Sequence, residues 1–244
     1  MNTLVLRTLA LADVRLLGRD PLLKWVLGLP FGLALVLRVL IPRAQDALIA
    51  NGFDMAPYFP LVMGGYLMTA PGIVGMVIGF LLLDERDART LSALRVTPLS
   101  MRQYLAYRIV SPLVVGTAST LLAYPLIGIT PIPFTSLLPI AAVAGMSAPL
   151  LALVLATAAP NKVAGFAAVK VLNGVNLLPV AAFFLPLPLQ YIAGIIPTYW
   201  PMRALWSAAQ SEPYFVYLTI GVMAAALSVV VAAHLFERRL LTRA

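Results

Sequence analysis

The chain has 244 residues, of which 61% are hydrophobic and only 11% are charged. A soluble domain carries roughly a quarter charged residues, so this chain has too little polar surface to cover a water-soluble globule. It has no cysteine and a single histidine, which excludes a disulfide framework, thiolate metal sites and a histidine cluster for a metal. In a membrane protein, the net charge of +8 indicates orientation and contact with anionic lipid rather than nucleic-acid binding.

The N-terminal residues predict a helix of their own before the first long apolar run. Apolar residues are spread around this helix, between charged residues such as Arg7 and Asp13, so it is not a clean amphipathic helix. We expect residues 1–20 to form a helix at the inner membrane surface. Asp20 as N-cap and Pro21 at the first helical position predict where the next helix begins.

Six stretches of the chain are long and apolar enough to cross a membrane, which requires roughly 20 mostly apolar residues. They are roughly Trp25–Pro42, Tyr58–Leu83, Ile109–Ile129, Leu137–Ala159, Ala164–Leu187 and Tyr214–Phe236. Backbone polar groups in lipid must pair within their own segment, so these stretches should be helices. The sequence therefore predicts an all-α integral membrane protein, with residues 1–244 forming a single transmembrane domain.

The basic residues predict the orientation of these spans. If the N-terminus lies inside, only Arg38, Arg43 and Arg203 of the 17 basic residues fall on the outer side, and the other 14 lie inside. Inner loops of membrane proteins carry the excess of lysine and arginine. We therefore expect a multi-pass protein with both termini in the cytoplasm.

Seven charged residues crowd into the stretch after the second span. They are Asp84, Glu85, Arg86, Asp87, Arg89, Arg95 and Arg102. A solvated turn is one interpretation, because inner loops commonly carry charge. The positive-inside rule needs only basic residues, however, so the three acidic residues favour a more specific role.

The same stretch predicts a short separate helix. Its acidic residues would occupy the first turn, where the helix dipole favours them, and Leu91 and Leu94 would share one side. Thr97 and Pro98 would end it, and Ser100 would begin the next helix. A short helix with both signs of charge beneath a membrane indicates a docking surface for another protein.

The fifth span contains polar residues that are expensive in lipid. Lys170, Asn173 and Asn176 fall within roughly a 120° sector of that helix, and Lys162 projects into the same sector. Our hypothesis is that this face lines a transport path or a seam between two subunits. In the alternative, Lys170 extends to the inner surface and the two asparagines bond to a neighbouring helix.

The connection between the fifth and sixth spans is too apolar for a free loop and too often interrupted for a full span. Proline residues, including Pro188, Pro197 and Pro201, break it, and it is rich in tyrosine and tryptophan. We expect residues 188–212 to form short helices that re-enter the outer leaflet and are held by aromatic side chains at the interface.

Two other function classes remain open on the residues alone. An intramembrane protease of the paired-glutamate type would need histidines in its spans, and only His234 is available. A passive channel or a membrane scaffold is compatible with the composition. Neither class explains a docking helix, so both are remote alternatives.

The charged stretch resembles the segment that follows the second span in permease subunits of type-2 ABC transporters. In that family the segment reads Asp-Glu-Arg-acidic-x-Gly-Thr-Leu-x-x-Leu-x-x-Thr-Pro-Leu-Ser. The matching residues are Asp84, Glu85, Arg86, Asp87, Thr90, Leu91, Leu94, Thr97, Pro98, Leu99 and Ser100. Arg89 stands where the family has glycine, which could alter how closely this segment sits on a partner. The six spans, surface helix and re-entrant segment extend the resemblance to the whole chain.

This resemblance implies that residues 84–100 form a cytoplasmic coupling helix that docks on a separate ATPase subunit. The coupling residues would be Asp84, Glu85, Arg86, Asp87, Arg89, Thr90, Leu91, Leu94 and Pro98. The chain has no phosphate-binding loop of the form Gly-x-x-x-x-Gly-Lys-Ser/Thr, so ATP and Mg²⁺ would be bound by the partner. Two ATPase subunits and two permeases, identical or paralogous, are implied.

Two further stretches, Asn161–Lys170 and Pro197–Pro201, resemble a branch of small drug-export permeases that includes fluoroquinolone exporters. The resemblance implies export of a hydrophobic or amphipathic small molecule, similar to a drug or antibiotic, across a bacterial-type plasma membrane. Export of a lipid, glycan or peptide by the same architecture remains an alternative.

Overall fold

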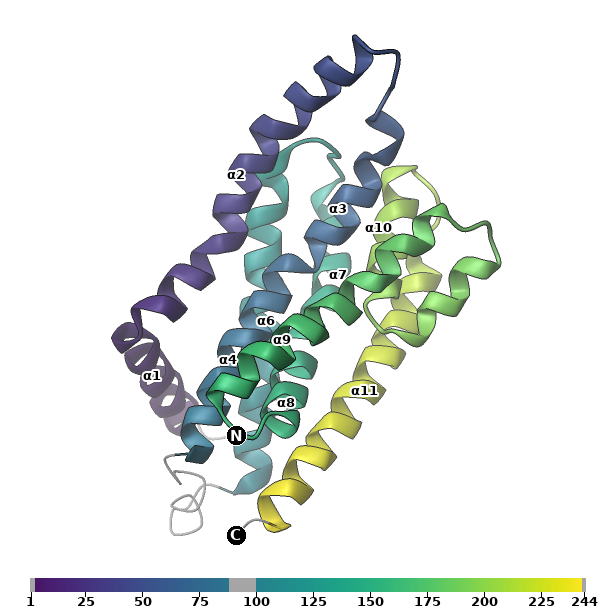
Figure 1. The fold of residues 1–244 in the computed structure, drawn as a ribbon. Helices are drawn as coiled ribbons and strands as arrows, with labels where there is room; N and C mark the ends of the chain where they lie inside the picture. Colours follow the sequence, from purple (N-terminus) through teal and green to yellow (C-terminus); the bar gives the residue numbers. More distant parts are fainter. Residues whose placement is uncertain (1–2, 88–99, 243–244) are drawn as a thin grey trace.

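The computed structural model describes residues 3–87 and 100–242, whose regular secondary structure is entirely helical, with no strand among them (Figure 1). The helices, in chain order, are α1 (Thr3–Arg19), α2 (Pro21–Ile49), η1 (Ala56–Tyr58), α3 (Phe59–Leu67), α4 (Thr69–Asp87), α6 (Met101–Ile127), α7 (Phe134–Gly145), α8 (Ser147–Ala158), α9 (Lys162–Leu177), η3 (Leu178–Phe184), η4 (Leu189–Ile195), α10 (Tyr199–Ala209) and α11 (Phe215–Thr242). The predicted fold class, an all-α integral membrane protein, is confirmed.

The six predicted spans are confirmed as helical segments that are long and apolar enough to cross a membrane. Their bounds are Leu23–Ile49, Ala56–Asp87, Met101–Ile127, Phe134–Ala158, Lys162–Phe184 and Phe215–Arg239. Helix α1, the end of α4 and the end of α11 lie at the same end of the bundle, which we call the charged end (Figure 1). It contains Asp84 and its charged neighbours at the end of α4.

Two predicted helix starts are confirmed by the hydrogen bonds of their caps. The Asp20 carboxylate accepts a hydrogen bond from the backbone N–H of Leu23 at 3.2 Å, at the start of α2. The Ser100 hydroxyl accepts from the backbone N–H of Gln103, whose side chain accepts from the N–H of Ser100 in return. This reciprocal pairing satisfies two backbone donors that a helix start leaves without partners.

Two of the predicted spans are interrupted, which the apolar pattern did not predict. The second span breaks between α3 and α4 at Met68, and the fourth between α7 and α8 at Met146. Each preceding helix ends four residues before a proline, at Leu67 before Pro71 and at Gly145 before Pro149. Proline has no N–H for the carbonyl four residues earlier and its ring clashes with that carbonyl, which accounts for both ends.

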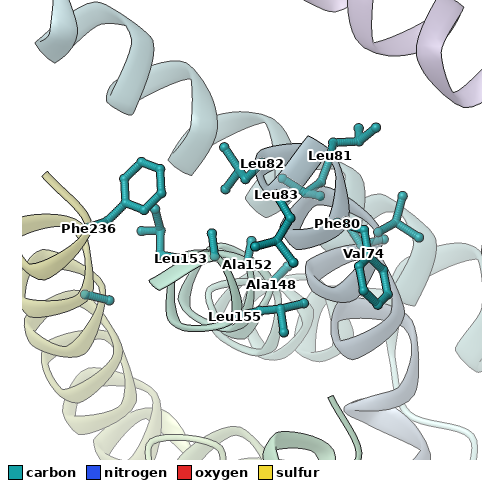
Figure 2. Packing of buried hydrophobic residues seen from close by; sticks show 14 of the residues in the cluster. Val74, Phe80, Leu81, Leu82, Leu83, Ala148, Ala152, Leu153, Leu155 and Phe236 are labelled. Carbon is teal, nitrogen blue, oxygen red and sulfur yellow. The ribbon is translucent and has the colours of Figure 1, made fainter. Parts of the chain in front are cut away.

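Helices α4 and α8 form the centre of the bundle and pack closely. A Cβ atom on Gly75 would lie 2.6 Å from the backbone oxygen of Ala148, and one on Gly79 would lie 2.7 Å from Leu155. The glycines therefore allow an approach that larger residues would block. Figure 2 shows the apolar cluster around this contact, with Phe236 contributed by α11.

A second apolar cluster fills the other half of the bundle, where α3, α6, α7 and α10 meet. Helix α10 lies in the connection expected to re-enter the membrane, and its side chains Tyr199, Met202 and Trp206 are buried in this cluster. Re-entry of residues 188–212 into the outer leaflet stays a prediction. The structure does show that the α10 part of this connection is packed helix rather than free loop.

The charged stretch begins differently from the prediction. Helix α4 continues through Asp87, so Asp84, Glu85 and Asp87 occupy the last turn of a spanning helix. They do not occupy the first turn of a separate helix, as the sequence pattern indicated. The rest of the expected coupling segment, from Arg89 to Pro98, lies outside the described residues.

Candidate functional site

Three consecutive residues at the end of α4 contact different parts of the charged end. Successive side chains on a helix point about 100° apart, so Asp84, Glu85 and Arg86 cannot share a partner surface. The Lys162 ammonium at the start of α9 donates to the Asp84 carboxylate at 2.9 Å. It also lies 3.6 Å from the carboxylate of Asp20, where α2 begins.

Glu85 belongs to a buried ionic network centred on Arg108 of α6. One nitrogen of the Arg108 guanidinium donates to both carboxylate oxygens of Asp13 in α1, at 2.8 and 3.0 Å. Its other terminal nitrogen donates to Glu85, and the Tyr104 hydroxyl donates to the same carboxylate. The Tyr107 hydroxyl donates to Asp13 at 2.7 Å.

The burial of this network makes each of its members important for the fold. The Arg108 side chain is 1% exposed, and Asp13 is 6% exposed. Removing one partner of a buried ion pair leaves an uncompensated charge and typically costs about 3–5 kcal/mol. The network therefore holds α1, α4 and α6 together at the charged end.

Arg86 stabilises the end of α8. Its guanidinium donates to the backbone oxygens of Ala156, Ala159 and Pro160 at 3.0, 2.9 and 2.7 Å. The last carbonyls of a helix have no partner within the helix and carry the negative end of its dipole, so a cation there is favourable. It also lies 3.6 Å from the carboxylate of Asp87, whose side chain is 49% exposed.

We call this set of contacts the charged hub. Its members are Asp13, Asp20, Asp84, Glu85, Arg86, Tyr104, Tyr107, Arg108 and Lys162. Asp84, Glu85 and Arg86 were predicted to contact another protein, and the structure places their described contacts within the chain. Asp87 is open to solvent, whereas Arg89, Thr90, Leu91, Leu94 and Pro98 lie outside the described residues.

The sequence did not predict which residues of the chain pair with the end of α4 in the charged hub. Asp13 was expected only as part of a surface helix, and Tyr104, Tyr107 and Arg108 were not singled out. A signal was present, because three polar side chains within five residues at the start of an apolar span need partners.

A cavity of about 170 Å³, partly open at the surface where Leu177 is 46% exposed, lies away from the hub. It is lined by Met68, Thr69, Gly72, Ile73, Ser147, Asn173, Asn176, Leu177 and Thr198. Both helix interruptions contribute to it, through Met68 and Thr69 on one side and Ser147 on the other. Each interruption is a single residue, Met68 or Met146, that keeps right-handed helical dihedral angles, so each is a local kink in a continuous span.

The backbone groups freed near the cavity are partly satisfied by hydroxyl groups. The Ser147 hydroxyl donates to the backbone oxygen of Ala144 at 2.7 Å, across the interruption between α7 and α8. The Thr198 hydroxyl donates to the backbone oxygen of Asn176 at 2.9 Å, close to where α9 ends. These bonds allow irregular backbone to persist inside an apolar bundle.

The structure separates the three polar residues predicted on the fifth span. Asn173 and Asn176 line the cavity, and neither side-chain amide bonds to another described residue. Lys170 is exposed and is not among the lining residues. Lys162, expected in the same sector, is engaged in the charged hub.

All nine lining side chains are uncharged, so the cavity offers neutral hydrogen-bonding groups and apolar surface. Pockets for drug-sized molecules are typically about 300–1,000 Å³, so this cavity is large enough for only part of such a molecule. Among the described residues, no group of three or more His, Cys, Asp or Glu side chains could hold a metal ion. The arrangement suits reversible binding by hydrogen bonds.

Comparison with known proteins identifies the family. Residues 13–233 match the family model described as fluoroquinolones export permease protein Rv2686c-like. The chain belongs to this family. Two proteins similar to it are the fluoroquinolones export permease proteins Rv2686c and MT2760 from the H37Rv and CDC 1551 strains of Mycobacterium tuberculosis. Each is 34% identical over 213 residues, which cover 86% of this chain and 84% of the relative.

Membership of this permease family supports a transport subunit rather than an enzyme, and with six apolar helical spans it supports a multi-pass membrane protein in drug export. The family match covers both the hub and the cavity, because it runs from Asp13 past Thr198. The predicted resemblance to small drug-export permeases is therefore confirmed.

Proposed function

We propose that the chain is the membrane subunit of an ATP-driven ABC exporter that moves a hydrophobic or amphipathic small molecule of the drug type out of the cell. The observation that carries the proposal is the neutral polar cavity where interrupted spans meet. Membership of the fluoroquinolone export permease family supports the cargo class. Export of a lipid, glycan or peptide is the alternative.

The driving force in this proposal comes from a partner. The chain carries no phosphate-binding loop, so ATP and Mg²⁺ are bound by two copies of a separate ATPase subunit. Two permeases, identical or paralogous, complete the complex. The distribution of basic residues supports a plasma-membrane orientation with both termini and the charged end in the cytoplasm, where ATP is available.

The ATPase docks on the 84–100 segment in this mechanism. Asp84, Glu85 and Arg86 are engaged in the charged hub, whereas the Asp87 side chain is 49% exposed. Asp87 and the residues from Arg89 to Pro98 therefore make the direct contacts with the ATPase. Closure of the ATPases on ATP then displaces the segment, and the displacement reaches the spans through α4 and α6, which flank it.

Asn173 and Asn176 contact the cargo from the wall of the cavity, and the apolar side chains of Met68, Ile73 and Leu177 contact its apolar part. The amides can donate and accept without a charge that would have to be desolvated. Lys170, one turn nearer the charged end on the same helix, is a candidate for contact along the approach to the cavity.

A pull-down from native membranes in mild detergent tests the ATPase partner. The tagged chain is compared with a variant in which residues 88–95 are scrambled, because this leaves Glu85 and Arg86 to hold the hub. An ATPase with a phosphate-binding loop should elute with the native chain and be lost from the scrambled one. Elution of no such ATPase with either chain would refute the ATP-driven mechanism.

Uptake into inverted vesicles tests the cargo. Vesicles that contain the complex should accumulate a fluoroquinolone only when ATP and Mg²⁺ are present on the ATPase side. ATP-dependent movement of a labelled lipid without movement of the drug would favour the alternative cargo.

A further inference from the structure

The ionic network around Arg108 links both ends of the 88–99 segment to the N-terminal helix. Glu85 lies in the last turn of α4, just before the segment, and Tyr104 lies in the first turns of α6, just after it. The Tyr104 hydroxyl donates to the Glu85 carboxylate, so the two ends are bonded to each other. Arg108 then joins this pair to Asp13 of α1.

Asp13 holds α1 in an unusual way. Among the side chains of α1 that the structure describes, residues 9–19, Asp13 is the buried one. The apolar side chains of Leu11, Val14 and Leu16 are 47%, 64% and 39% exposed. Over residues 9–19, α1 therefore contacts the bundle mainly through this ionic contact, with Leu9 and Leu17 as partly buried neighbours.

We propose that Asp13 is a positioning residue for energy coupling, which ties α1 to both ends of the 88–99 segment through Arg108. This inference rests on the proposed function, because it assumes that a partner ATPase moves that segment. Asp13 itself contacts neither cargo nor ATP. Its role is to make α1 move together with the ends of α4 and α6.

The guanidinium geometry explains why movement would be transmitted. Its nitrogens are held in one plane, with donors in fixed directions. One terminal nitrogen is bonded to Asp13 and the other to Glu85, so the group acts as a rigid link between two carboxylates. A shift of Glu85 turns the guanidinium plane and displaces Asp13. Hydrogen bonds from Tyr104 and Tyr107 hold each carboxylate in place on its own side.

The test uses Asp13→Asn in the full chain, together with Asp13→Glu, which keeps the charge. Arg108 stays paired with Glu85 in both variants, so the buried guanidinium is never left without an acid. Asp46→Asn is the matched control, because Asp46 is exposed and distant from the charged end, near the end of α2. Each protein is reconstituted in nanodiscs and in vesicles with its ATPase.

Hydrogen exchange in nanodiscs without ATPase tests the attachment of α1. In Asp13→Asn, backbone amides of α1 should exchange at least roughly tenfold faster, because local opening loses its ionic restraint. Asp13→Glu and Asp46→Asn should leave exchange near that of the wild type. Unchanged exchange in Asp13→Asn would overturn the inference, whatever the complex does with ATP.

The ratio of fluoroquinolone transported to ATP hydrolysed tests the positioning role. Coupling between sites typically amounts to about 5- to 150-fold, so this ratio should fall at least about fivefold in Asp13→Asn. Asp13→Glu should restore it, and Asp46→Asn should match the wild type. Faster exchange with an unchanged ratio would show a purely structural contact and overturn the inference.

Loss of the proposed function is distinguishable from loss of this inference. If the wild type and every variant alike show no ATP-driven transport, the proposed function fails and the coupling role of Asp13 fails with it. The exchange measurement would still report whether Asp13 holds α1. A ratio of transport to ATP hydrolysis that falls only in Asp13→Asn supports both the proposed function and the coupling role of Asp13.

Discussion

The charged hub and the polar cavity are both polar regions inside an apolar bundle, but they use their polar groups in opposite ways. In the hub, the charged side chains are paired, and Arg108 and Lys162 each serve two carboxylates. In the cavity, the amides of Asn173 and Asn176 are uncharged and bond to no other described side chain. The hub therefore stabilises the fold, whereas the cavity keeps hydrogen-bonding capacity for a ligand.

This contrast suggests a way to separate structural from functional polar residues in membrane proteins. A charge in lipid is so costly that it persists only with a partner, so removing one partner from a buried ionic network should cost stability. A neutral amide costs less to leave partly free, so an amide beside a cavity indicates binding. Substitutions in the hub should change stability, and at Asp13 also the coupling of transport to ATP hydrolysis, whereas substitutions in the cavity should change transport alone.

Replacing Arg108 should have the largest effect on stability. Arg108→Gln leaves Asp13 and Glu85 buried without a cation, which should lower the free energy of unfolding by about 3–5 kcal/mol. The measurement is unfolding in detergent micelles. Arg38→Gln is the control, because exposed Arg38 makes a single described bond, to the Leu126 backbone oxygen, and should cost within about 1 kcal/mol. Equal losses of unfolding free energy in Arg108→Gln and Arg38→Gln would refute the structural role of the hub.

The contact between α4 and α8 connects the two regions, so it should be the next most sensitive. A methyl group at Gly75 would lie 2.6 Å from the Ala148 backbone oxygen, and Gly75→Ala should cost about 1–3 kcal/mol. Gly28→Ala is the matched control, since no described atom lies within 4 Å of its added Cβ. The thermal midpoint of Gly75→Ala should fall, while that of Gly28→Ala should stay level or rise.

Removing the cavity amides should change transport without changing stability. Asn173→Ala and Asn176→Ala each delete one hydrogen bond to cargo, worth about 0.5–1.5 kcal/mol, so transport at low drug concentration should fall about 2- to 10-fold. The measurement is initial uptake of a fluoroquinolone into inverted vesicles. Asn51→Ala, in the turn after α2, is the matched control. Wild-type uptake in both cavity variants would remove Asn173 and Asn176 from the path.

Replacing Lys170 should have the smallest effect on transport. It tests whether the cargo path extends beyond the residues that line the cavity. Lys170→Gln alters an exposed side chain that the proposal places on the approach and not in the lining, so uptake should change less than in Asn173→Ala, by less than about twofold. A larger loss than in Asn173→Ala would place the cargo path along the exposed face of α9 instead of in the cavity.

The sequence predicted the features that depend on local chemistry. Spans follow from apolar runs, and the starts of α2 and α6 follow from Asp20 and Ser100, whose side chains bond to backbone only three residues away. The amides of the cavity were found because a polar residue in lipid stands out. Lys170 was grouped with them because helical periodicity predicts which side of the helix a residue faces, but not how far along the helix a cavity extends.

Features that depend on distant partners were not predictable in the same way. Asp13 and Arg108 are 95 residues apart, and no local pattern pairs them. The interruption at Met68 has a local cause in Pro71, yet Pro112 and Pro125 lie inside α6 without ending it. A proline is thus compatible with both outcomes, and the surrounding packing decides between them.

The position of the hub in the chain also affects how the protein is made. Asp84 leaves the ribosome 78 residues before its partner Lys162, a delay of about 4–16 s at 5–20 residues per second. During that interval the end of α4 has none of its contacts with α9 or the end of α8, so the charges of Asp84 and Arg86 must stay in water or among lipid headgroups, whereas Glu85 can already pair with Arg108. The last turn of α4 can therefore reach its final packing only after the fifth span has begun to emerge.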